Sequence, residues 1–284
     1  GVNGYAFFND GQPIEISPSH HYYVLDDPAS YAHYADYPAA YKIYSARRDL
    51  LCWELARDSD GSLFISGSTD SYGDYYVFNG YVTKTDDLGK VIWQTLVKVD
   101  DISRTNIHQV IPTGDGGCLF IGYYELLDNP HYDMSFGFLG RLDPTGQVAW
   151  YKIMRPVDNR THFRNAFRTS DGNVIVFGTT RTSNFYPVIM KIDLDGNIIW
   201  QKIIEQNNPR PSLFEGVELQ QGGYAFFGSN ENTADNRPVI LTLNEDGSLR
   251  WNRSYAYANG ASISPTKDNG FLLAIGFPKD TLGE

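Results

Sequence analysis

The stretch "KIDLDGNIIWQK", residues 191–202, contains a pattern that returns three more times in the chain. The other copies are "KTDDLGKVIWQT" at 84–95, "RLDPTGQVAWYK" at 141–152 and "TLNEDGSLRWNR" at 242–253. In every copy a glycine stands four residues before a tryptophan, and an Asp or Asn stands three residues before that glycine. The tryptophans are 57, 50 and 51 residues apart along the sequence. Self-similarity at this period indicates a repeat protein.

Each copy has the composition of a β-hairpin. An apolar run is followed by an Asp or Asn that can bond its own turn, then by a glycine suited to positive φ, then by a second run that contains the tryptophan. Calcium binding is the alternative for 191–202, because Asp193, Asp195 and Asn197 alternate there. Only the first of these positions recurs in the other copies, and none carries the later glutamate of a calcium loop. We therefore predict turns and no metal site.

A second hairpin lies between these copies and occurs five times. Each instance has a strand, a tight Asp-Gly or Gly-rich turn, and a second strand that we expect to end at a glycine. The instances are "ARDSDGSLFISGS" at 56–68, "IPTGDGGCLFIGY" at 111–123, "FRTSDGNVIVFGT" at 167–179, "VELQQGGYAFFGS" at 217–229 and "SPTKDNGFLLAIGF" at 264–277. One repeat thus comprises four short strands and no helix.

A single sheet of four antiparallel strands cannot bury both of its faces. Several such sheets packed radially around a common axis cover the faces of one another. We predict an all-β protein, a β-propeller of four-stranded antiparallel blades that forms a single domain over 1–284. Five blades are expected, at about 52–98, 107–156, 163–205 and 213–257, with a composite blade of 261–277 and 22–46. Six blades are the alternative, because "NGYAFF" at 3–8 resembles "GGYAFF" at 222–227.

Composition excludes several classes of protein. The chain has 284 residues, 42% of them hydrophobic, and should fold around a core. A net charge of −11 disfavours nucleic acid as a partner. No apolar run is long enough to cross a bilayer, so we expect no transmembrane segment. The stretch "GVNGYAFFND" at 1–10 lacks a basic region followed by an apolar one, so we expect that any export signal has been removed or never existed. We expect a monomer.

Only two cysteines occur, Cys52 and Cys118, which are 66 residues apart. They form neither a disulfide framework nor a CxxC pair. We expect two small buried residues in strands, with a single disulfide as the alternative.

These repeats resemble a bacterial propeller repeat of secreted and surface proteins, "DGGY" with an apolar run and glycine, then "K-apolar-D-x-x-G-x-apolar-x-W". A weaker resemblance links "LDPTGQVAW" at 142–150 to the tryptophan-docking repeat of quinoprotein dehydrogenases. The first resemblance implies export, often as a lipoprotein, to the periplasm, the outer cell surface or the extracellular space of a bacterium. The second implies a quinone cofactor with calcium, but those enzymes have eight blades and a vicinal disulfide, so we expect no cofactor.

In a propeller, the innermost strands of all blades would converge at one opening on the axis. A ligand bound there would contact residues from each blade. Counting seven and six residues back from the turn of each second hairpin gives the candidate ligand-binding residues. They are Trp53, Glu54, His108, Gln109, Arg164, Asn165, Phe214 and Glu215. These positions predict a site for a glycan, peptide or partner protein. The alternative is a solvated channel without a ligand.

Two groups of loops add further signals. Basic residues in 103–108, 158–165 and 207–212 would suit an anion such as a uronic acid, or would pair with acidic residues at the rim. Tyrosine-rich loops at 68–80, 123–137 and 179–187 would suit a polymer or protein partner, or would shield the ends of the sheets.

No nucleophile, zinc, phosphate or dinucleotide motif occurs, which favours a non-catalytic protein without catalytic residues. The alternative function is glycoside hydrolysis, with Glu54 and Glu215 as the pair of carboxylates.

Overall fold

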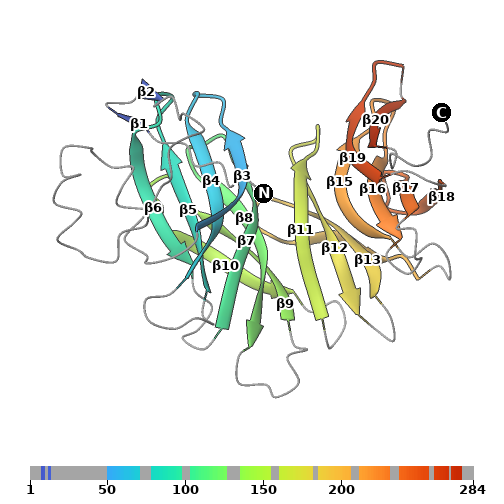
Figure 1. Cartoon of the computed structure of the whole chain (residues 1–284), viewed down its shortest axis with the longest axis horizontal. Coiled ribbons are helices and arrows are strands. Elements are labelled where there is room, and N and C mark those ends of the chain that lie inside the picture. Colours follow the sequence, from blue (N-terminus) through green and yellow to red (C-terminus); the bar gives the residue numbers. More distant parts are fainter. Residues whose placement is uncertain are drawn as a thin grey trace, which may run out of the picture. The chain divides into compact units, whose positions relative to one another are not determined.

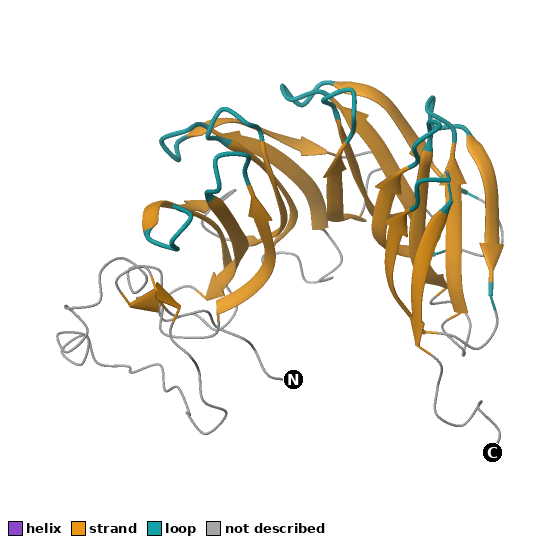
Figure 2. Cartoon of the chain, turned by 90° about the horizontal axis from the view of Figure 1, so that it is seen from above, coloured by secondary structure: helices purple, strands orange, loops and turns teal. Residues whose placement is uncertain are grey.

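The protein is represented by a computed structural model that describes residues 8–9, 12–13, 50–70, 78–97, 103–126, 135–154, 160–181, 185–205, 211–230, 237–255, 259–268 and 270–276. All regular structure in these residues is β-strand, and Figures 1 and 2 show no helix among them. The predicted all-β class is therefore confirmed. Within these same ranges no helix has the length and apolar character needed to span a membrane.

The chain divides into two compact units. The first contains Gly1–Phe120, Tyr124–Tyr132 and Arg141–Trp150, and the second contains Ile121–Tyr123, Asp133–Gly140 and Tyr151–Glu284. The single domain expected over 1–284 remains a prediction.

The first unit contains one complete four-stranded antiparallel sheet, with its strands side by side in chain order (Figure 1). Its strands are β3 (Leu50–Arg57), β4 (Leu63–Asp70), β5 (Phe78–Thr85) and β6 (Val91–Val97). Next come β7 (Ser103–Pro112), β8 (Cys118–Leu126), β9 (Ser135–Leu142) and β10 (Val148–Met154), through which the division between the units runs. Two short strands, β1 (Phe8–Asn9) and β2 (Gln12–Pro13), pair with each other.

The second unit repeats the four-strand pattern twice. The first group is β11 (Arg160–Arg168), β12 (Val174–Arg181), β13 (Phe185–Ile192) and β14 (Ile198–Ile203). The second group is β15 (Ser212–Glu218), β16 (Tyr224–Asn230), β17 (Arg237–Leu243) and β18 (Leu249–Ser254). β11 is joined to β9 by one parallel residue pair, Arg160 with Ser135, so strands β7 to β14 count as one eight-stranded sheet.

The last strands, β19 (Asn259–Pro265) and β20 (Phe271–Gly276), form an antiparallel pair. This confirms the two strands expected within 261–277. Residues 22–46, expected to complete that sheet, lie outside the described residues, as do most of residues 3–8 on which the six-blade alternative rests.

The repeated Asp-x-x-Gly stretches form tight turns, as predicted. In the copy that opened the sequence analysis, Asp193 Oδ1 accepts hydrogen bonds from the backbone N–H of Asp195 at 3.0 Å and of Asn197 at 2.8 Å. Gly196 has a φ of 71° and donates its N–H to the Asp193 carbonyl. The carboxylate thus caps backbone amides, which is the role expected of a turn residue.

Two of the repeated tryptophans, Trp93 and Trp200, contact the hairpin of the next repeat, a feature absent from the sequence-based predictions. Trp200 Nε1 donates to the Glu245 carbonyl at 3.1 Å, and a Cβ on Gly247 would lie 2.8 Å from the Trp200 ring. Trp93 bonds the Pro144 carbonyl at 2.9 Å in the same way. Glycine and tryptophan recur together because the indole of one sheet lies on the turn of the following one.

The sheet β15–β18 of the second unit buries both of its faces at strand β16. Tyr224 and Phe226 of β16 belong to a core cluster with Phe177 and Ile189 of the preceding sheet. Ala225 and Phe227, which alternate with them, pack with Ile263 of β19 and its neighbours. A strand covered on both sides indicates sheets stacked face to face, each filling the core of the next.

Candidate functional site

In three of the sheets, the first strand carries a β-bulge. The bulge lies seven residues before the following turn, at a position that the sequence analysis selected. In β3 the register shifts between Cys52 and Glu54, which leaves Trp53 as the extra residue. The same shift leaves Arg164 as the extra residue in β11 and Phe214 in β15. A bulge frees one residue from the ladder and redirects its side chain.

The bulge residues are exposed although they lie in strands that help to form the core. Trp53 is 44% exposed and Phe214 is 38% exposed, and Arg164 is exposed as well. Three equivalent repeat positions thus present a large side chain to solvent. This is the arrangement expected of residues available to a ligand.

A glycine lies opposite each of these bulges and permits it. A Cβ on Gly67, Gly178 or Gly228 would fall 1.9, 1.8 or 2.1 Å from a carbonyl oxygen of the first strand. We expected these glycines to end their strands, and that expectation was wrong. β4, β12 and β16 continue past them, because the glycine is needed for close backbone approach.

Within the first unit, two candidate residues from consecutive repeats are in contact. The rings of Trp53 and His108 stack with centroids 4.6 Å apart and planes at 30°. Trp53 Nε1 donates to Ser68 Oγ at 3.4 Å, which helps to orient the indole. Glu54 and Gln109, the neighbouring candidates, are half-buried.

Within the second unit, the candidates one residue after the bulge connect adjacent sheets. Asn165 Nδ2 donates to the carbonyl of Phe214 at 2.9 Å. Glu215 Oε2 accepts a hydrogen bond from the backbone N–H of Ile263 at 2.7 Å. These polar side chains therefore hold neighbouring first strands together, a structural role that the sequence analysis did not foresee.

Cys52, next to the Trp53 bulge, is exposed, whereas Cys118 is buried in β8. Both thiols are free, so no disulfide joins them. The expectation of two buried cysteines is correct for Cys118 and wrong for Cys52, because the bulge turns this part of β3 toward solvent. Burial raises the pKa of the Cys118 thiol far above its usual range, which keeps it protonated.

A serine and a histidine in the second unit form a hydrogen bond of the kind seen between a nucleophile and its base. Ser135 Oγ bonds His162 Nε2, and the His162 ring stacks on Tyr123 with centroids 4.2 Å apart and planes at 7°. However, Ser135 is only 2% exposed. A substrate has no access to its hydroxyl, so this cluster packs β8 and β9 against β11.

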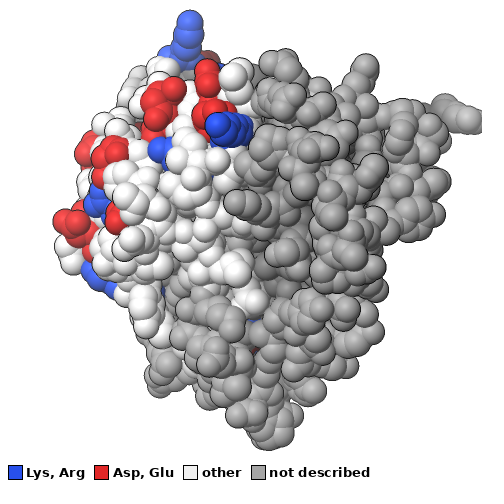
Figure 3. Space-filling model, turned by 90° about the vertical axis from the view of Figure 1, so that its left-hand side faces the viewer, with Lys and Arg blue, Asp and Glu red and all other residues white. Residues whose placement is uncertain are grey.

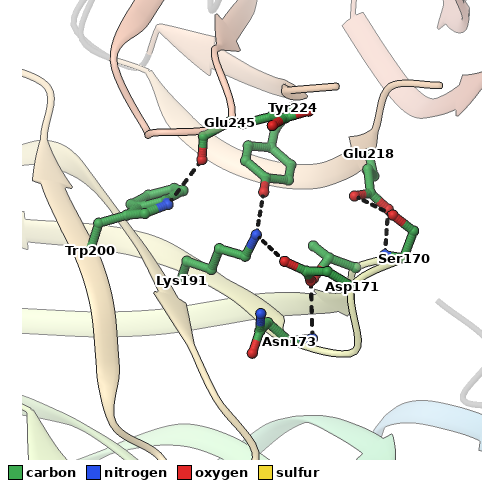
Figure 4. A network of polar contacts seen from close by, with 9 residues as sticks. Ser170, Asp171, Asn173, Lys191, Trp200, Glu218, Tyr224 and Glu245 are labelled. Atoms are coloured by element: carbon green, nitrogen blue, oxygen red, sulfur yellow. Dashed lines mark hydrogen bonds and ion pairs between the residues drawn. The ribbon is translucent and has the colours of Figure 1, made fainter. Parts of the chain in front are cut away.

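Lys191 is the centre of a polar network between two sheets (Figure 4). Its Nζ lies 2.6 Å from Asp171 Oδ2 and 3.0 Å from the Tyr224 hydroxyl. Burial alone would lower the pKa of Lys191, but these two partners outweigh it and raise that pKa. Burial also raises the pKa of Tyr224. The pKa values of Lys191 and Tyr224 are thus both raised further above neutral pH. Neither group is therefore suited to act as a general base.

Two carboxylates, Asp171 and Glu218, accept hydrogen bonds in and beside this network. Burial alone would raise the pKa of Asp171, but hydrogen bonds from Lys191, Thr169 and Asn173 outweigh it and hold that pKa well below its usual range. Nearby, Glu218 accepts from Ser170 N–H at 2.7 Å and from the Ser170 hydroxyl at 3.0 Å (Figure 4). These contacts connect the turn of one sheet to the first strand of the next.

The loops predicted to bind anions or polymers are described only in part. Arg104 of β7 lies 3.7 Å from Glu125 of β8. Arg210 and most of the three tyrosine-rich loops lie outside the described residues. In the ranges that the structure covers, no three His, Cys, Asp or Glu side chains are grouped as a metal site would require.

No protein-family model matches the sequence, and no curated protein matches it either. Among solved structures, the chain is similar to a protein of unknown function from Dyadobacter fermentans DSM 18053. The identity is 14% and the TM-score 0.56, over 80% of this chain and 76% of that one. A likeness at this identity indicates a common fold and says nothing of function.

Two enzymes are similar at a lower level. An alpha-L-arabinofuranosidase from Lactobacillus brevis has 13% identity and a TM-score of 0.42, over 81% of this chain and 84% of that one. A gluconolactonase from Xanthomonas campestris has 13% identity and a TM-score of 0.42, over 80% of this chain and 72% of that one. TM-scores of this size establish neither a shared fold nor a shared activity.

Proposed function

We propose that the chain is a five-bladed β-propeller that a bacterium exports to its periplasm, its surface or its surroundings, and that it binds a glycan without catalysis. The observation that supports binding is the bulge, which places exposed Trp53, Arg164 and Phe214 at one repeat position. Export rests on the resemblance to secreted and surface propeller repeats. Subcellular fractionation of the native host would test it, and a cytoplasmic protein would contradict it.

Ring closure is the structural half of the proposal. We expect residues 22–46 to join β19 and β20 in one sheet, which would make the fifth blade. Two exposed leucines support this, Leu272 of β20 at 67% and Leu55 of β3 at 57%, because such side chains favour a covering sheet.

Disulfide trapping would test the closure. In a Cys52→Ser background, a cysteine at the exposed position Ala274 is combined in turn with cysteines at positions 22 to 27. Paired strands bring opposite Cβ atoms to roughly 5 Å, so one combination should oxidise within a monomer. If no combination oxidises, the composite blade is refuted.

Glycan recognition follows from the chemistry of the bulge residues. An indole offers a flat apolar face to the C–H groups of a sugar ring, and stacking on His108 holds the Trp53 ring in place. Arg164, two repeats further along the sequence, carries hydrogen-bond donors suited to hydroxyl groups. A peptide or a partner protein could use the same residues, and the binding experiment separates these ligands.

Surface charge is consistent with this class of ligand. Figure 3 shows the left-hand side of the molecule as drawn in Figure 1, where Lys and Arg are interspersed with Asp and Glu. The described part of that face carries no extended basic patch of the kind that binds nucleic acid.

A glycan array with wild type, Trp53→Ala and Tyr151→Ala would test the site. Tyr151 is an aromatic residue that is 56% exposed and lies in β10, the last strand of its repeat and not a bulged first strand, so it is the matched control. We expect Trp53→Ala to weaken binding about tenfold or more and Tyr151→Ala to leave it unchanged. Equal binding by wild type and Trp53→Ala would refute the site.

Glycoside hydrolysis by Glu54 and Glu215 is the alternative function. It requires an available carboxylate at Glu215, one oxygen of which already bonds the Ile263 backbone. We therefore expect no turnover of aryl glycosides by the wild type. Turnover that is abolished in Glu215→Gln would support the hydrolase and contradict the proposal.

A further inference from the structure

Arg164 and Phe214, the bulge residues of two neighbouring sheets in the second unit, are linked through the residue that follows Arg164. The Asn165 Nδ2 donates to the Phe214 carbonyl at 2.9 Å. The Asn165 Oδ1 accepts a hydrogen bond from the Ala166 N–H at 2.7 Å, which holds this side chain at both ends. The bonds along this path keep the Cα atoms of Arg164 and Phe214 within roughly 13 Å of each other. One oligosaccharide can therefore contact both bulges.

The charge of Arg164 is exposed and has no acidic partner in the part of the chain that the structure describes. Its own strand, β11, contains no Asp or Glu. The two carboxylates of the adjacent strand β15 are bonded elsewhere. Glu215 accepts from the Ile263 N–H and Glu218 accepts from the Ser170 N–H, both at 2.7 Å. An anionic ligand could therefore approach Arg164 without displacing a carboxylate of either strand.

The backbone at both bulges is closely packed against the strand opposite. A Cβ on Gly178 would fall 1.8 Å from the carbonyl oxygen of His162, and one on Gly228 would fall 2.1 Å from that of Ser212. Such close approach leaves the bulged backbone little freedom to move. A site whose backbone is already held in place loses less conformational entropy when a ligand binds.

The two side chains have complementary chemistry. A guanidinium group has a planar set of donors that matches both oxygens of a carboxylate. Phe214, which is 38% exposed, offers an apolar ring to the C–H groups of a sugar. We infer that Arg164 binds the carboxylate of a uronic acid in the glycan, and that Phe214 contacts the ring of that sugar or of its neighbour. This inference rests on the proposed glycan binding and specifies its chemical class.

Titration calorimetry with a galacturonic acid trimer and a neutral galactose trimer would test the inference. The variants are Arg164→Gln, Arg164→Lys and Phe214→Ala, with Arg253→Gln as the control. Arg253 is exposed in β18, the last strand of its repeat, so its substitution changes the net charge equally and leaves the bulges intact. Thermal unfolding would confirm that each variant is folded.

We expect the wild type to bind the acidic trimer more tightly than the neutral one. Arg164→Gln should weaken acidic binding about tenfold or more and neutral binding about threefold or less, because a hydrogen bond to a charged group is the stronger one. Arg164→Lys, which keeps the charge and loses the fork, should fall between wild type and Arg164→Gln. Phe214→Ala should weaken binding of both trimers by a similar factor, and Arg253→Gln should bind as wild type does.

Several results would overturn the inference and leave glycan binding intact. Equal affinity of the wild type for both trimers, unchanged acidic binding in Arg164→Gln, or an equal loss of both trimers in that variant would show that Arg164 recognises no carboxylate. Tighter binding of a sulfated galactose trimer than of the galacturonic acid trimer would show that the anion is a different one.

Binding of neither trimer would also overturn the inference, and the glycan array would then decide the fate of the proposed function. Another glycan that binds the wild type and is lost in Trp53→Ala would preserve that function. A negative array would remove both.

Discussion

Substitution of Gly178 by alanine would test whether the bulge of β11 depends on the glycine opposite it. A Cβ at this position would lie 1.8 Å from the carbonyl oxygen of His162 and 2.9 Å from the Cα of Phe163. Carbon and oxygen normally approach no closer than about 3.3 Å, so the two strands would have to separate by more than an ångström. Both atoms belong to backbone, so no side-chain rotation can relieve the collision.

The expected cost follows from two opposing effects. Forcing extra atoms into a packed strand pair costs about 1–3 kcal/mol, and more where backbone must move. Alanine regains roughly 0.5–1 kcal/mol because it is less flexible than glycine in the unfolded chain. We expect Gly178→Ala to lower the free energy of unfolding by about 3 kcal/mol.

Gly172→Ala is the matched control. Gly172 has a φ of +85° and no atom within 4 Å of a built Cβ, so alanine there meets strained backbone but no collision. Its expected cost is about 1 kcal/mol. Urea unfolding followed by tryptophan fluorescence measures both variants, since Trp200 packs against the core cluster that contains Phe177. A cost for Gly178→Ala no larger than that for Gly172→Ala would refute the reasoning.

Three further predictions concern the contacts between strands and sheets. Trp200→Phe removes the donor to the Glu245 carbonyl and should lower the free energy of unfolding by about 1–2 kcal/mol in urea unfolding followed by circular dichroism, where an unchanged midpoint would contradict the docking contact. The folded-state pKa of Asp171 is depressed, so its stabilisation is present above the unfolded value of about 3.9 and is lost as pH falls. The melting temperature of Asp171→Asn should therefore depend less on pH below about 4 than that of wild type, and parallel curves would argue against this pair. Calcium or EDTA should leave the melting temperature unchanged, because Asp193 already accepts two backbone amides, and a rise with calcium would show a metal site.

The local turns and strand pairs could be predicted from the sequence because their chemistry is contained within a few residues. Asp193 and Gly196 act within one turn, so their spacing alone specifies the hairpin. Contacts between repeats could not be read in this way. The sequence shows that glycine and tryptophan recur together, but only the structure shows that the indole of Trp200 lies on Gly247 of the following repeat.

The sequence analysis selected the positions of three bulge residues, but it did not predict the bulges. Counting back from the turns located Trp53 and Phe214, yet a bulge adds one residue without disturbing the sequence pattern, so nothing marked them as bulge residues. The glycine opposite, such as Gly178, was a usable signal that we interpreted as a strand end. Glu215 illustrates a different difficulty. A glutamate that contacts a ligand and a glutamate that bonds a neighbouring backbone cannot be told apart from the sequence.

The contact of Trp93 and Trp200 with the turn of the following repeat has a consequence for how such a chain can gain repeats. A tandem duplication of one repeat would add one tryptophan and one turn. The new turn would contact the tryptophan of the preceding repeat. Growth would then leave only the terminal tryptophan to find another partner. Trp251, the last in the chain, lies 6.3 Å from the ring of Phe271 in β20. Descent by successive duplication of one unit is the history that this polarity favours.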